Sequence, residues 1–202
     1  MGTILKALSL SGVAYLLGSI PWGLIIARLF NVGDLLNSGS GNIGANNVRR
    51  IAGIVPGILT LVMDAAKAGI PVYIARTLFA SNQSALPWVL SLVAFCAFLG
   101  HLYPVYMGFR NGGKGVATAA GGVAMISLGA VLAAIVMYVL FLILSRRSSV
   151  GSMTAAVTLP VFIQVAEKSM VYTSCALVMS IWIVIRHQAN IRRLVQGEEP
   201  PV

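Results

Sequence analysis

The chain alternates long apolar stretches with short polar stretches that carry Arg or Lys among Gly, Ser and Asn. Of its 202 residues, 58% are hydrophobic and only 9% are charged, so a soluble globular domain would leave large apolar surfaces in water. A helix needs about 20 apolar residues to cross a bilayer, and stretches near this length recur along the chain. The sequence therefore predicts an all-α integral membrane protein.

Seven apolar stretches are candidates for transmembrane helices. They cover residues 5–29, 51–76, 86–107, 115–127, 129–145, 152–166 and 170–187. The fourth stretch is short, so one long, kinked helix over residues 115–145 is the alternative. This alternative would reduce the number of spans to six and change which loops share a side of the membrane.

The distribution of positive charge favours seven spans over six. With seven, ten of the fourteen Lys and Arg fall on one side, whereas six would scatter the polar loops over both sides. The polar stretches that share this side are residues 31–50, 108–114, 146–151 and the tail from residue 188. Because Lys and Arg collect in cytoplasmic loops, we expect the N terminus outside and the polar loops on the cytoplasmic face. Residues 1–202 would form a single seven-helix domain.

Several other classes of protein are excluded or disfavoured. The formal net charge of +9 does not indicate nucleic acid, because the cations are spread through apolar sequence and form no basic stripe. Cys96 and Cys175 lie in apolar runs outside any Cys-x-x-Cys pattern, so they fit buried small apolar residues better than a disulfide or a metal site. Two distant histidines and few carboxylates offer no cluster of metal ligands, so we expect neither a metal nor a cofactor. No Ala-x-Ala site follows the first apolar stretch, which favours a retained span over a signal peptide.

The first polar loop combines glycines with hydrogen-bonding side chains. Its glycine spacing over residues 39–44 matches the dinucleotide fingerprint G-x-G-x-x-G, but a dinucleotide site also needs a βαβ unit, which this chain lacks. Glycines let backbone amides approach an anion, Ser and Asn add donors, and Arg grips phosphate in a bidentate fork. Phosphate binding is the prediction for this loop, and a flexible connector is the alternative.

The second polar loop comes within one residue of a Walker A sequence. Gly115 stands where the Mg²⁺-binding Ser or Thr should be, and no strand precedes the loop, so an ATPase is a poor interpretation. A turn of Gly112, Gly113 and Lys114 that opens into a helix still favours anion binding, because amides, the positive helix end and an ammonium converge there. His101, upstream, could be structural or catalytic.

Three further polar features leave both a structural and a functional role open. Asp64 and Lys67 stand three residues apart inside a predicted span, where they can pair on one helix face. The stretch with Ser149 and Ser152 could cap a helix or anchor the topology. The tail places His187 and Asn190 three residues apart on one helix face, where they could also contact lipid headgroups.

Five polar blocks follow one another in order between residues 15 and 199. They are Gly18-Ser19-Ile20-Pro21-x-Gly23; Ser38-Gly-Ser40-Gly-Asn42-x-Gly44-Ala45-x-Asn47-x-x-Arg50; Gly100-His101-x-x-Pro104 leading to Gly112-Gly-Lys114-Gly-Val-Ala-Thr118; Arg146-x-x-Ser149-x-Gly-Ser152; and Arg186-His187-x-x-Asn190-Ile-x-Arg193-Leu-x-x-Gly197-x-Glu199. Together these blocks resemble the bacterial acyl-phosphate:glycerol-3-phosphate acyltransferases, the PlsY family.

This resemblance implies a seven-helix, multi-pass enzyme of the bacterial cell inner membrane. Such an enzyme transfers a fatty acyl group from acyl phosphate to the 1-hydroxyl of sn-glycerol 3-phosphate, which gives 1-acyl-glycerol 3-phosphate (lysophosphatidic acid) and phosphate in phospholipid biosynthesis. Its partners would be acyl phosphate, glycerol 3-phosphate and membrane lipid, with functional coupling to an acyl-phosphate-forming enzyme. The His-x-x-x-x-Asp motif of acyl-CoA-dependent enzymes is absent, since His101 is followed at that spacing by Tyr106 and His187 by Arg192.

The chain departs from the family pattern in its second polar loop. Phe109–Gly115 is one residue longer than the Phe-Lys-Gly-Gly-Lys-Gly segment usual in the family. The extra residue moves Arg110 relative to Lys114, so the resemblance assigns no role to Arg110.

The expected chemistry determines the expected site. Acyl phosphate is a mixed anhydride with a good leaving group, so the enzyme must align the hydroxyl, stabilise the oxyanion and leaving phosphate, and remove one proton. Either His187 or a substrate phosphate oxygen could take that proton. The expected catalytic residues are His187, Lys114, Arg50 and Asn190. The expected phosphate-binding residues are Ser40, Asn42, Asn47, Arg50, Gly112, Gly113, Lys114, Ser149 and Ser152.

These residues would share one electropositive basin at the inner leaflet. The alternative class is an anion transporter with discontinuous helices, but its helix breaks would meet near the middle of the membrane and not at one face.

Overall fold

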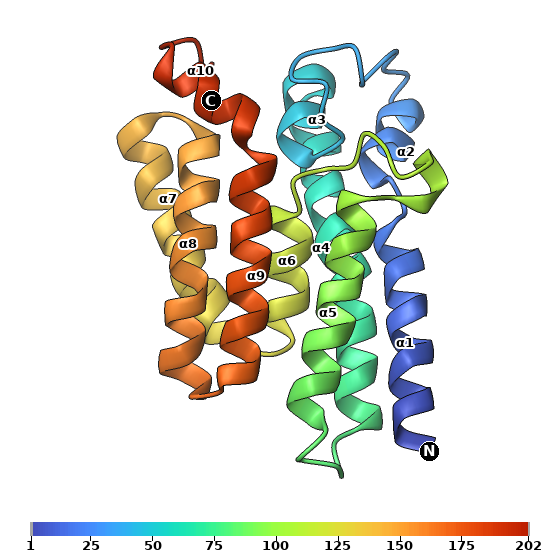
Figure 1. Cartoon of the computed structure of the whole chain (residues 1–202). Helices are drawn as coiled ribbons and strands as arrows, with labels where there is room; N and C mark the ends of the chain where they lie inside the picture. The colour runs from blue at the N-terminus through green and yellow to red at the C-terminus, as the bar shows by residue number, and fades with distance from the viewer. Residues whose placement is uncertain (1, 202) are drawn as a thin grey trace. The chain divides into compact units, whose positions relative to one another are not determined.

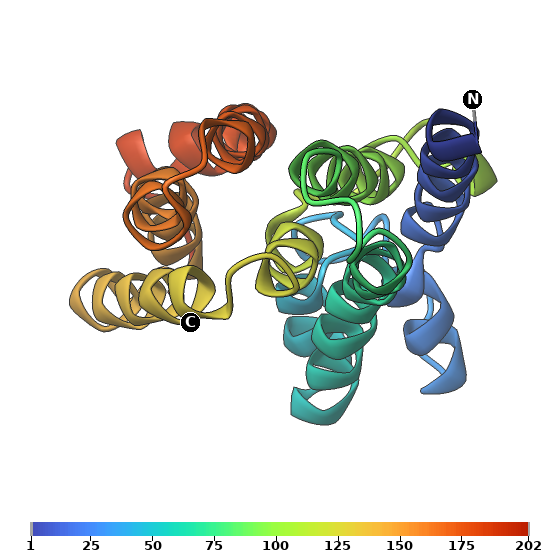
Figure 2. The same cartoon turned by 90° about the horizontal axis from the view of Figure 1, so that it is seen from below.

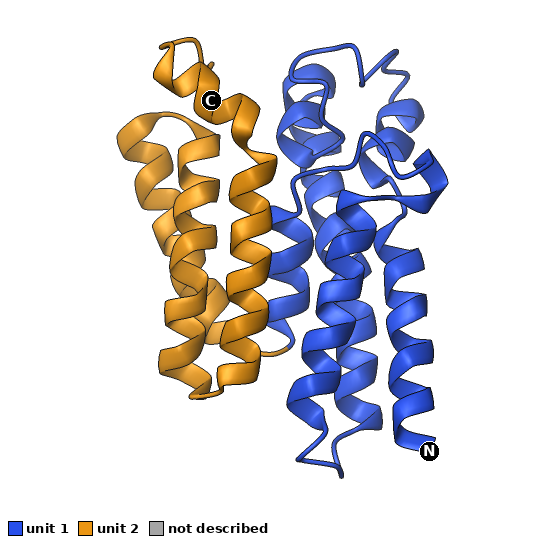
Figure 3. Ribbon diagram, viewed as in Figure 1, with its two compact units in different colours: residues 1–125 blue, residues 126–202 orange. Residues whose placement is uncertain are grey.

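The computed structural model describes residues 2–201, and these residues form helices and no strand (Figure 1). The α-helices are α1 (Gly2–Gly18), α2 (Trp22–Leu29), α3 (Ala45–Ala52), α4 (Ile54–Leu78), α5 (Leu86–Leu102), α6 (Val116–Ala124), α7 (Leu128–Ser145), α8 (Ser148–Glu167), α9 (Met170–Arg186) and α10 (Gln188–Val195). A short 3-10 helix, η1 (Val105–Met107), follows α5. The chain divides into two compact units, residues 1–125 and 126–202 (Figure 3). The single domain expected over residues 1–202 stays a prediction.

Several helices are long and apolar enough to cross a membrane. Among the described residues these are Gly2–Leu29, Ile54–Leu78, Leu86–Met107, Leu128–Ser145 and Ser148–Glu167, and the pair α9 and α10, bent by 54°, adds a sixth if it counts as one span. The nine residues of α6 rise only about 14 Å, less than the hydrocarbon core of a bilayer. The all-helical membrane fold is therefore confirmed, and the seventh span and the orientation stay predictions.

The two alternatives for residues 115–145 are resolved in favour of two helices. Residues 125–127 separate α6 from α7. Ser127 has the extended backbone angles φ −145° and ψ 91°, which no α-helix accommodates. The single kinked helix is therefore wrong.

The predicted span of residues 5–29 is not a continuous helix. Helix α1 ends at Gly18 and α2 begins at Trp22. Pro21 explains the break, because it has no N–H to donate and it disfavours a helical conformation at the residue before it. The hydroxyl of Ser19 donates to the carbonyl of Tyr15 at 2.8 Å at the end of α1. Helices α1 and α2 together form the candidate span Gly2–Leu29, so the predicted span of residues 5–29 is found, with a break inside it that the sequence did not predict.

In residues 1–125, helices α1, α4, α5 and α6 run alternately in opposite directions (Figures 1 and 2). Helix α1 contacts α5, and α4 contacts α1, α5 and α6. Helices α2 and α3 and the loop between α5 and α6 lie at one end of this unit, whereas residues 79–85 lie at the other. The polar loops over residues 31–50 and 108–114 therefore share one end of this unit, as the charge pattern predicted.

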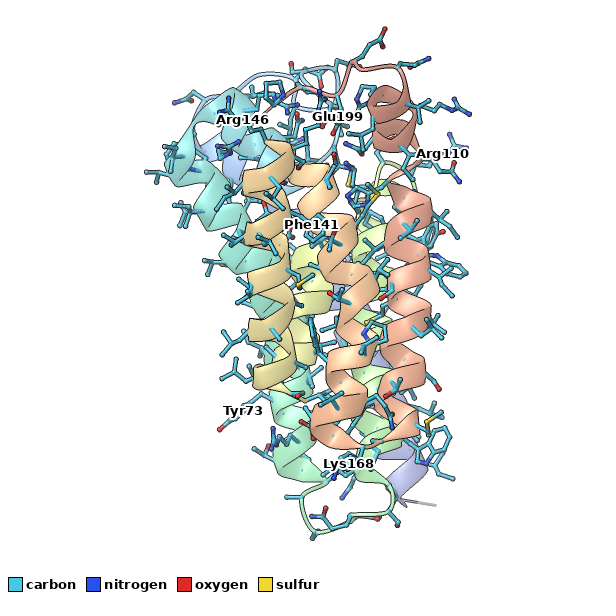
Figure 4. The ribbon with its side chains drawn as sticks, turned by 90° about the vertical axis from the view of Figure 1, so that its left-hand side faces the viewer. Tyr73, Arg110, Phe141, Arg146, Lys168 and Glu199 are labelled. Atoms are coloured by element: carbon cyan, nitrogen blue, oxygen red, sulfur yellow. The ribbon has the colours of Figure 1, made fainter. Side chains whose placement is uncertain are left out.

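In residues 126–202, α8 packs against α7 on one side and α9 on the other (Figure 2). The turn between α7 and α8 and the whole of α10 lie at one end of this unit. Figure 4 shows Arg146 and Glu199 at that end and Lys168 at the opposite end. The third polar loop and the tail thus share one end of this unit.

Two glycines let α1 and α5 cross closely. A Cβ at Gly18 would lie 2.1 Å from the Ala97 carbonyl oxygen, and a Cβ at Gly100 would lie 2.2 Å from the Tyr15 carbonyl oxygen. Small residues allow such backbone approach between membrane helices. The crossing fixes the position of the last turn of α5, which carries His101.

Replacing Gly100 with Ala should destabilise the protein by about 1–3 kcal/mol, because the new methyl group meets backbone that cannot move aside cheaply. Gly12→Ala in α1 is the matched control, since a Cβ there meets nothing within 4 Å and Ala favours a helix more than Gly does. Thermal unfolding in detergent should show a lower Tm for Gly100→Ala and an equal or higher Tm for Gly12→Ala. Equal effects of both changes would contradict the close crossing.

Candidate functional site

The first polar loop begins with a turn around Asp34. Its carboxylate accepts hydrogen bonds from the backbone amides of Leu36 (3.1 Å) and Asn37 (3.2 Å) and from the Asn37 side chain. These bonds, with that of the Asn37 side chain strongest, hold the pKa of Asp34 below its ordinary value. The carboxylate therefore stays ionised at neutral pH and serves the turn.

Asn47, in the first turn of α3, holds the rest of this loop. Its side-chain amide is buried and donates to the carbonyl oxygens of Ser38 (3.1 Å) and Leu35 (3.4 Å). Its side-chain oxygen accepts the backbone N–H of Ser40 at 2.8 Å. Asn42 acts locally, since its side-chain oxygen accepts the N–H of Gly44 at 2.8 Å. Both asparagines shape the loop, and their expected phosphate contacts stay predictions.

A small apolar core anchors the same segment. Ala27, Leu35 and Val48 are almost fully buried and pack with flanking apolar residues of α2 and α3. Ser40 and Arg50 lie exposed in this segment. The first polar loop is thus a folded element with polar side chains on its surface, and the flexible connector is the weaker interpretation.

The glycines of the second polar loop pack against the end of α5. The N–H of Gly113 donates to the His101 carbonyl at 3.1 Å, and a Cβ at Gly113 would lie 1.9 Å from Nε2 of the His101 ring. A Cβ at Gly112 would lie 2.0 Å from the Leu102 carbonyl oxygen. No side chain fits at either position, so glycine is required by close approach.

Lys114 stands where this loop enters α6. Gly115, which follows it, has a left-handed φ of +86° and leaves no room for a Cβ against the Phe98 ring. Lys114 is half-buried, one residue before the N-cap position of the helix. Lys114 therefore lies between the glycine turn and the positive start of α6, an arrangement that suits an anion.

The second polar loop contains a turn with left-handed backbone angles. Gly108, Phe109 and Asn111 have φ angles of +61°, +63° and +55°. Arg110 lies exposed between them (Figure 4).

Behind the glycine turn, three titratable side chains form a buried cluster. Lys67 Nζ lies 2.8 Å from Asp64 Oδ1 and 2.8 Å from Nδ1 of His101. The sequence predicted the pairing of Asp64 with Lys67, and the structure confirms it. The contact of His101 with Lys67 could not be predicted from the sequence, because it links positions 34 residues apart.

In residues 126–202, four of the predicted site residues are buried. They are Ser149, Ser152, His187 and Asn190. The two serines lie in the first turns of α8, and His187 joins α9 to α10. His187 Nδ1 lies 2.7 Å from the carbonyl oxygen of Ile183, which can only accept a hydrogen bond. The neutral ring therefore carries its proton on Nδ1 and keeps its lone pair on Nε2, the tautomer that suits a base.

Asn190 bonds to a residue that the predicted site did not include. Its side-chain amide donates to Oε1 of Glu199 at 2.7 Å, while Arg193 Nε donates to Oε2 at 2.7 Å. The Ser149 hydroxyl also interacts with this carboxylate, although outside strict hydrogen-bond geometry. Burial would raise the pKa of Glu199, but these three partners together lower it below its ordinary value. The available signal for this residue was its place at the end of the fifth polar block of the sequence.

The structure brings the predicted residues together in two groups. In residues 1–125, Gly112, Gly113 and Lys114 form one turn, and Ser40, Asn42, Asn47 and Arg50 belong to one folded segment. In residues 126–202, Ser149 and Asn190 meet at Glu199. The described residues contain no group of three or more His, Cys, Asp or Glu able to hold a metal ion.

Comparisons with known proteins agree on one family. The family model described as glycerol-3-phosphate acyltransferase matches residues 8–197. A glycerol-3-phosphate acyltransferase of Geobacter sulfurreducens is 42% identical over 196 residues, which are 97% of each chain. One from Anaeromyxobacter dehalogenans (strain 2CP-C) is 45% identical and covers all of this chain and 98% of its own.

Two crystal structures of PlsY (YgiH), an integral membrane glycerol 3-phosphate acyltransferase, share the fold. The glycerol 3-phosphate form superposes with a TM-score of 0.90 at 40% identity, over 98% of this chain and 96% of that one. The lysophosphatidic acid form gives 0.88 at 39% identity, over 97% and 95% of the two chains.

Glu199→Gln should loosen the tail, because a neutral amide loses the charge-assisted bonds to Asn190 and Arg193. Hydrogen exchange over residues 188–199 should rise several-fold at neutral pH. The exposed neighbour Glu198 provides the matched control, Glu198→Gln, which should leave exchange unchanged.

The same loosening should follow acidification of the unmodified protein. Because the pKa of Glu199 is lowered on folding, its stabilising effect is complete above the ordinary value of 4.5 and is lost as the pH falls through the lowered value. Exchange rates corrected for intrinsic pH dependence measure this. Loosening on raising the pH from 5 to 7 would contradict the assignment.

Proposed function

This chain belongs to the glycerol-3-phosphate acyltransferase family, and we propose on that basis that it transfers a fatty acyl group to the 1-hydroxyl of sn-glycerol 3-phosphate. The product is 1-acyl-glycerol 3-phosphate, that is lysophosphatidic acid. Relatives crystallised in a glycerol 3-phosphate form and in a lysophosphatidic acid form support both the acceptor and the product. The reaction belongs to phospholipid biosynthesis.

We propose acyl phosphate as the donor. A phosphorylated donor and a phosphorylated acceptor both need cations, and the chain supplies them at the ends of its helices while carrying only five carboxylates. The absence of a His-x-x-x-x-Asp motif argues against an acyl-CoA-dependent reaction. An apolar groove of about 420 Å³ between α4 and α6 offers a surface for a lipid-soluble donor.

The proposed reaction is a single displacement. The 1-hydroxyl oxygen attacks the acyl carbon, and the bond from that carbon to the phosphate oxygen breaks to release phosphate. A base accepts the hydroxyl proton. Because phosphate is a good leaving group, positioning and charge stabilisation supply the catalysis without a covalent enzyme intermediate. Lys114 and Arg50 would stabilise the departing phosphate, and His187 would accept the proton, with Asn190 completing the catalytic group.

The phosphate groups would be held by residues of the polar stretches. The candidates are Ser40, Asn42, Asn47, Arg50, Gly112, Gly113, Lys114, Ser149 and Ser152. The turn of Gly112, Gly113 and Lys114 before α6 carries the assignment, because close approach excludes side chains there and a cation stands at a helix start. For Asn42 and Asn47, which already bond the loop backbone, binding would be indirect.

We further propose a multi-pass protein of the bacterial inner membrane with seven spans and its N terminus outside. Helix α6 would be the short span, tolerated because α4 and α5 pack against it within the same unit. Membrane lipid would surround the apolar helix faces, and an acyl-phosphate-forming enzyme would supply the donor.

Purified protein with synthetic acyl phosphate and glycerol 3-phosphate should release phosphate and form lysophosphatidic acid. Lys114→Ala should lower kcat/KM at least 100-fold, because it removes charge where phosphate departs. Lys6→Ala is the control, since Lys6 is exposed in α1, away from the polar loops, and should keep full activity. Phosphate release by Lys114→Ala at the unmodified rate would refute the site.

His187→Ala should lower kcat by about 100-fold to 10,000-fold if this residue is the general base. The pH dependence of kcat should then lose the limb that requires a neutral imidazole. A rise in KM with kcat nearly unchanged would instead assign the proton to a substrate phosphate oxygen. His187→Gln, which keeps a donor to the Ile183 carbonyl, separates loss of the base from loss of the helix junction.

A further inference from the structure

The buried cluster of Asp64, Lys67 and His101 takes no part in the acyl transfer described above. The three residues are 2%, 5% and 4% exposed, and two of them lie inside α4, a candidate membrane span. Charged groups at this depth are costly and are kept mainly where they act on something. An apolar set of the same volume would often serve stability as well.

Three groups surround the Lys67 ammonium, one by ion pairing and two by hydrogen bonding. Nζ lies 2.8 Å from Asp64 Oδ1, 3.0 Å from the carbonyl oxygen of Ile20 and 2.8 Å from His101 Nδ1. The ammonium can only donate, so Nδ1 of His101 must accept and the neutral ring carries its proton on Nε2. His101 Nδ1 lies 3.6 Å from Asp64 Oδ1, beyond a direct hydrogen bond. Lys67 Nζ therefore holds Asp64, the Ile20 carbonyl and the His101 ring in position relative to one another.

These contacts join three separate segments of residues 1–125. Ile20 lies in the break between α1 and α2, Asp64 and Lys67 lie in α4, and His101 is in the last turn of α5. At this break the Ile20 carbonyl oxygen accepts hydrogen bonds from the backbone N–H of Trp22 and from Lys67 Nζ, both at 3.0 Å. The cluster thus orients the final turn of α5.

The opposite edge of the His101 ring faces the glycine turn. A Cβ at Gly113 would lie 1.9 Å from Nε2, and the Gly113 N–H donates to the His101 backbone carbonyl at 3.1 Å. The ring therefore packs directly on the backbone of the residue that precedes Lys114. Rotation or withdrawal of the ring would remove the support of this turn.

From this geometry we infer that Asp64, Lys67 and His101 are positioning residues for phosphate-ester binding. They hold the backbone of Gly112, Gly113 and Lys114 in the conformation that receives the phosphate of glycerol 3-phosphate. The inference rests on the proposed function, which it extends to three residues that touch no substrate themselves. A purely structural cluster would affect stability and leave substrate affinity unchanged.

The test compares substrate affinity with stability. The double variant Asp64→Leu with Lys67→Met removes both charges at similar volume and should keep Tm within a few degrees. Its dissociation constant for glycerol 3-phosphate, measured by calorimetry, and its KM for the same substrate should both rise at least tenfold. Thr60→Val is the matched control, because Thr60 is buried in the same helix and bonds only the Pro56 carbonyl, so both constants should stay unchanged.

A pair of His101 variants covers the case in which the double variant fails to fold. His101→Leu removes the acceptor for Lys67 and should weaken glycerol 3-phosphate binding, whereas His101→Gln keeps an acceptor and an N–H and should restore part of it. Variants with unmodified Tm that bind glycerol 3-phosphate as tightly as the parent overturn the positioning role and leave the acyl transfer standing. A parent protein that neither binds glycerol 3-phosphate nor releases phosphate overturns the proposed function, and the inference with it.

Discussion

A bilayer offers no water to polar groups, and this constraint decides where each polar part of the chain can lie. The apolar stretches satisfy most of their backbone internally by forming helices, and the polar loops collect at helix ends (Figure 1). The exception is the cluster in α4, where each charge has a partner within 3 Å. Chemistry on phosphate esters is compatible with such a protein only at these polar ends, which is where Lys114 and His187 lie in their respective units.

The long apolar helices could be predicted closely, because their apolar length is visible in the sequence. The stretches expected at residues 129–145 and 170–187 are found at 128–145 and 170–186. The break at Ile20 was missed, since it interrupts no apolar run and depends on the backbone restriction that Pro21 imposes on its neighbours. Composition reports that a segment enters the membrane, but not whether the helix within it is continuous.

The site could be predicted in part. The glycine turn before α6 follows from local sequence, because glycine and a helix start are both visible there. The partners of His101 and Asn190 could not be found in this way, since Lys67 lies 34 residues from His101 and Glu199 follows Asn190 without helical periodicity. A polar residue type shows that a hydrogen bond is needed. It does not show whether a ligand or the protein itself provides it.

Asn47 has a consequence for which changes the first loop can tolerate. Its three hydrogen bonds reach only main-chain atoms, at Leu35, Ser38 and Ser40. The side chains at Ser38 and Ser40 can therefore vary without breaking these bonds, whereas an insertion or deletion between them would displace the acceptors and donor together. Substitutions at these two serines could therefore change substrate preference, while the Asn47 side-chain amide keeps the backbone of the loop in place.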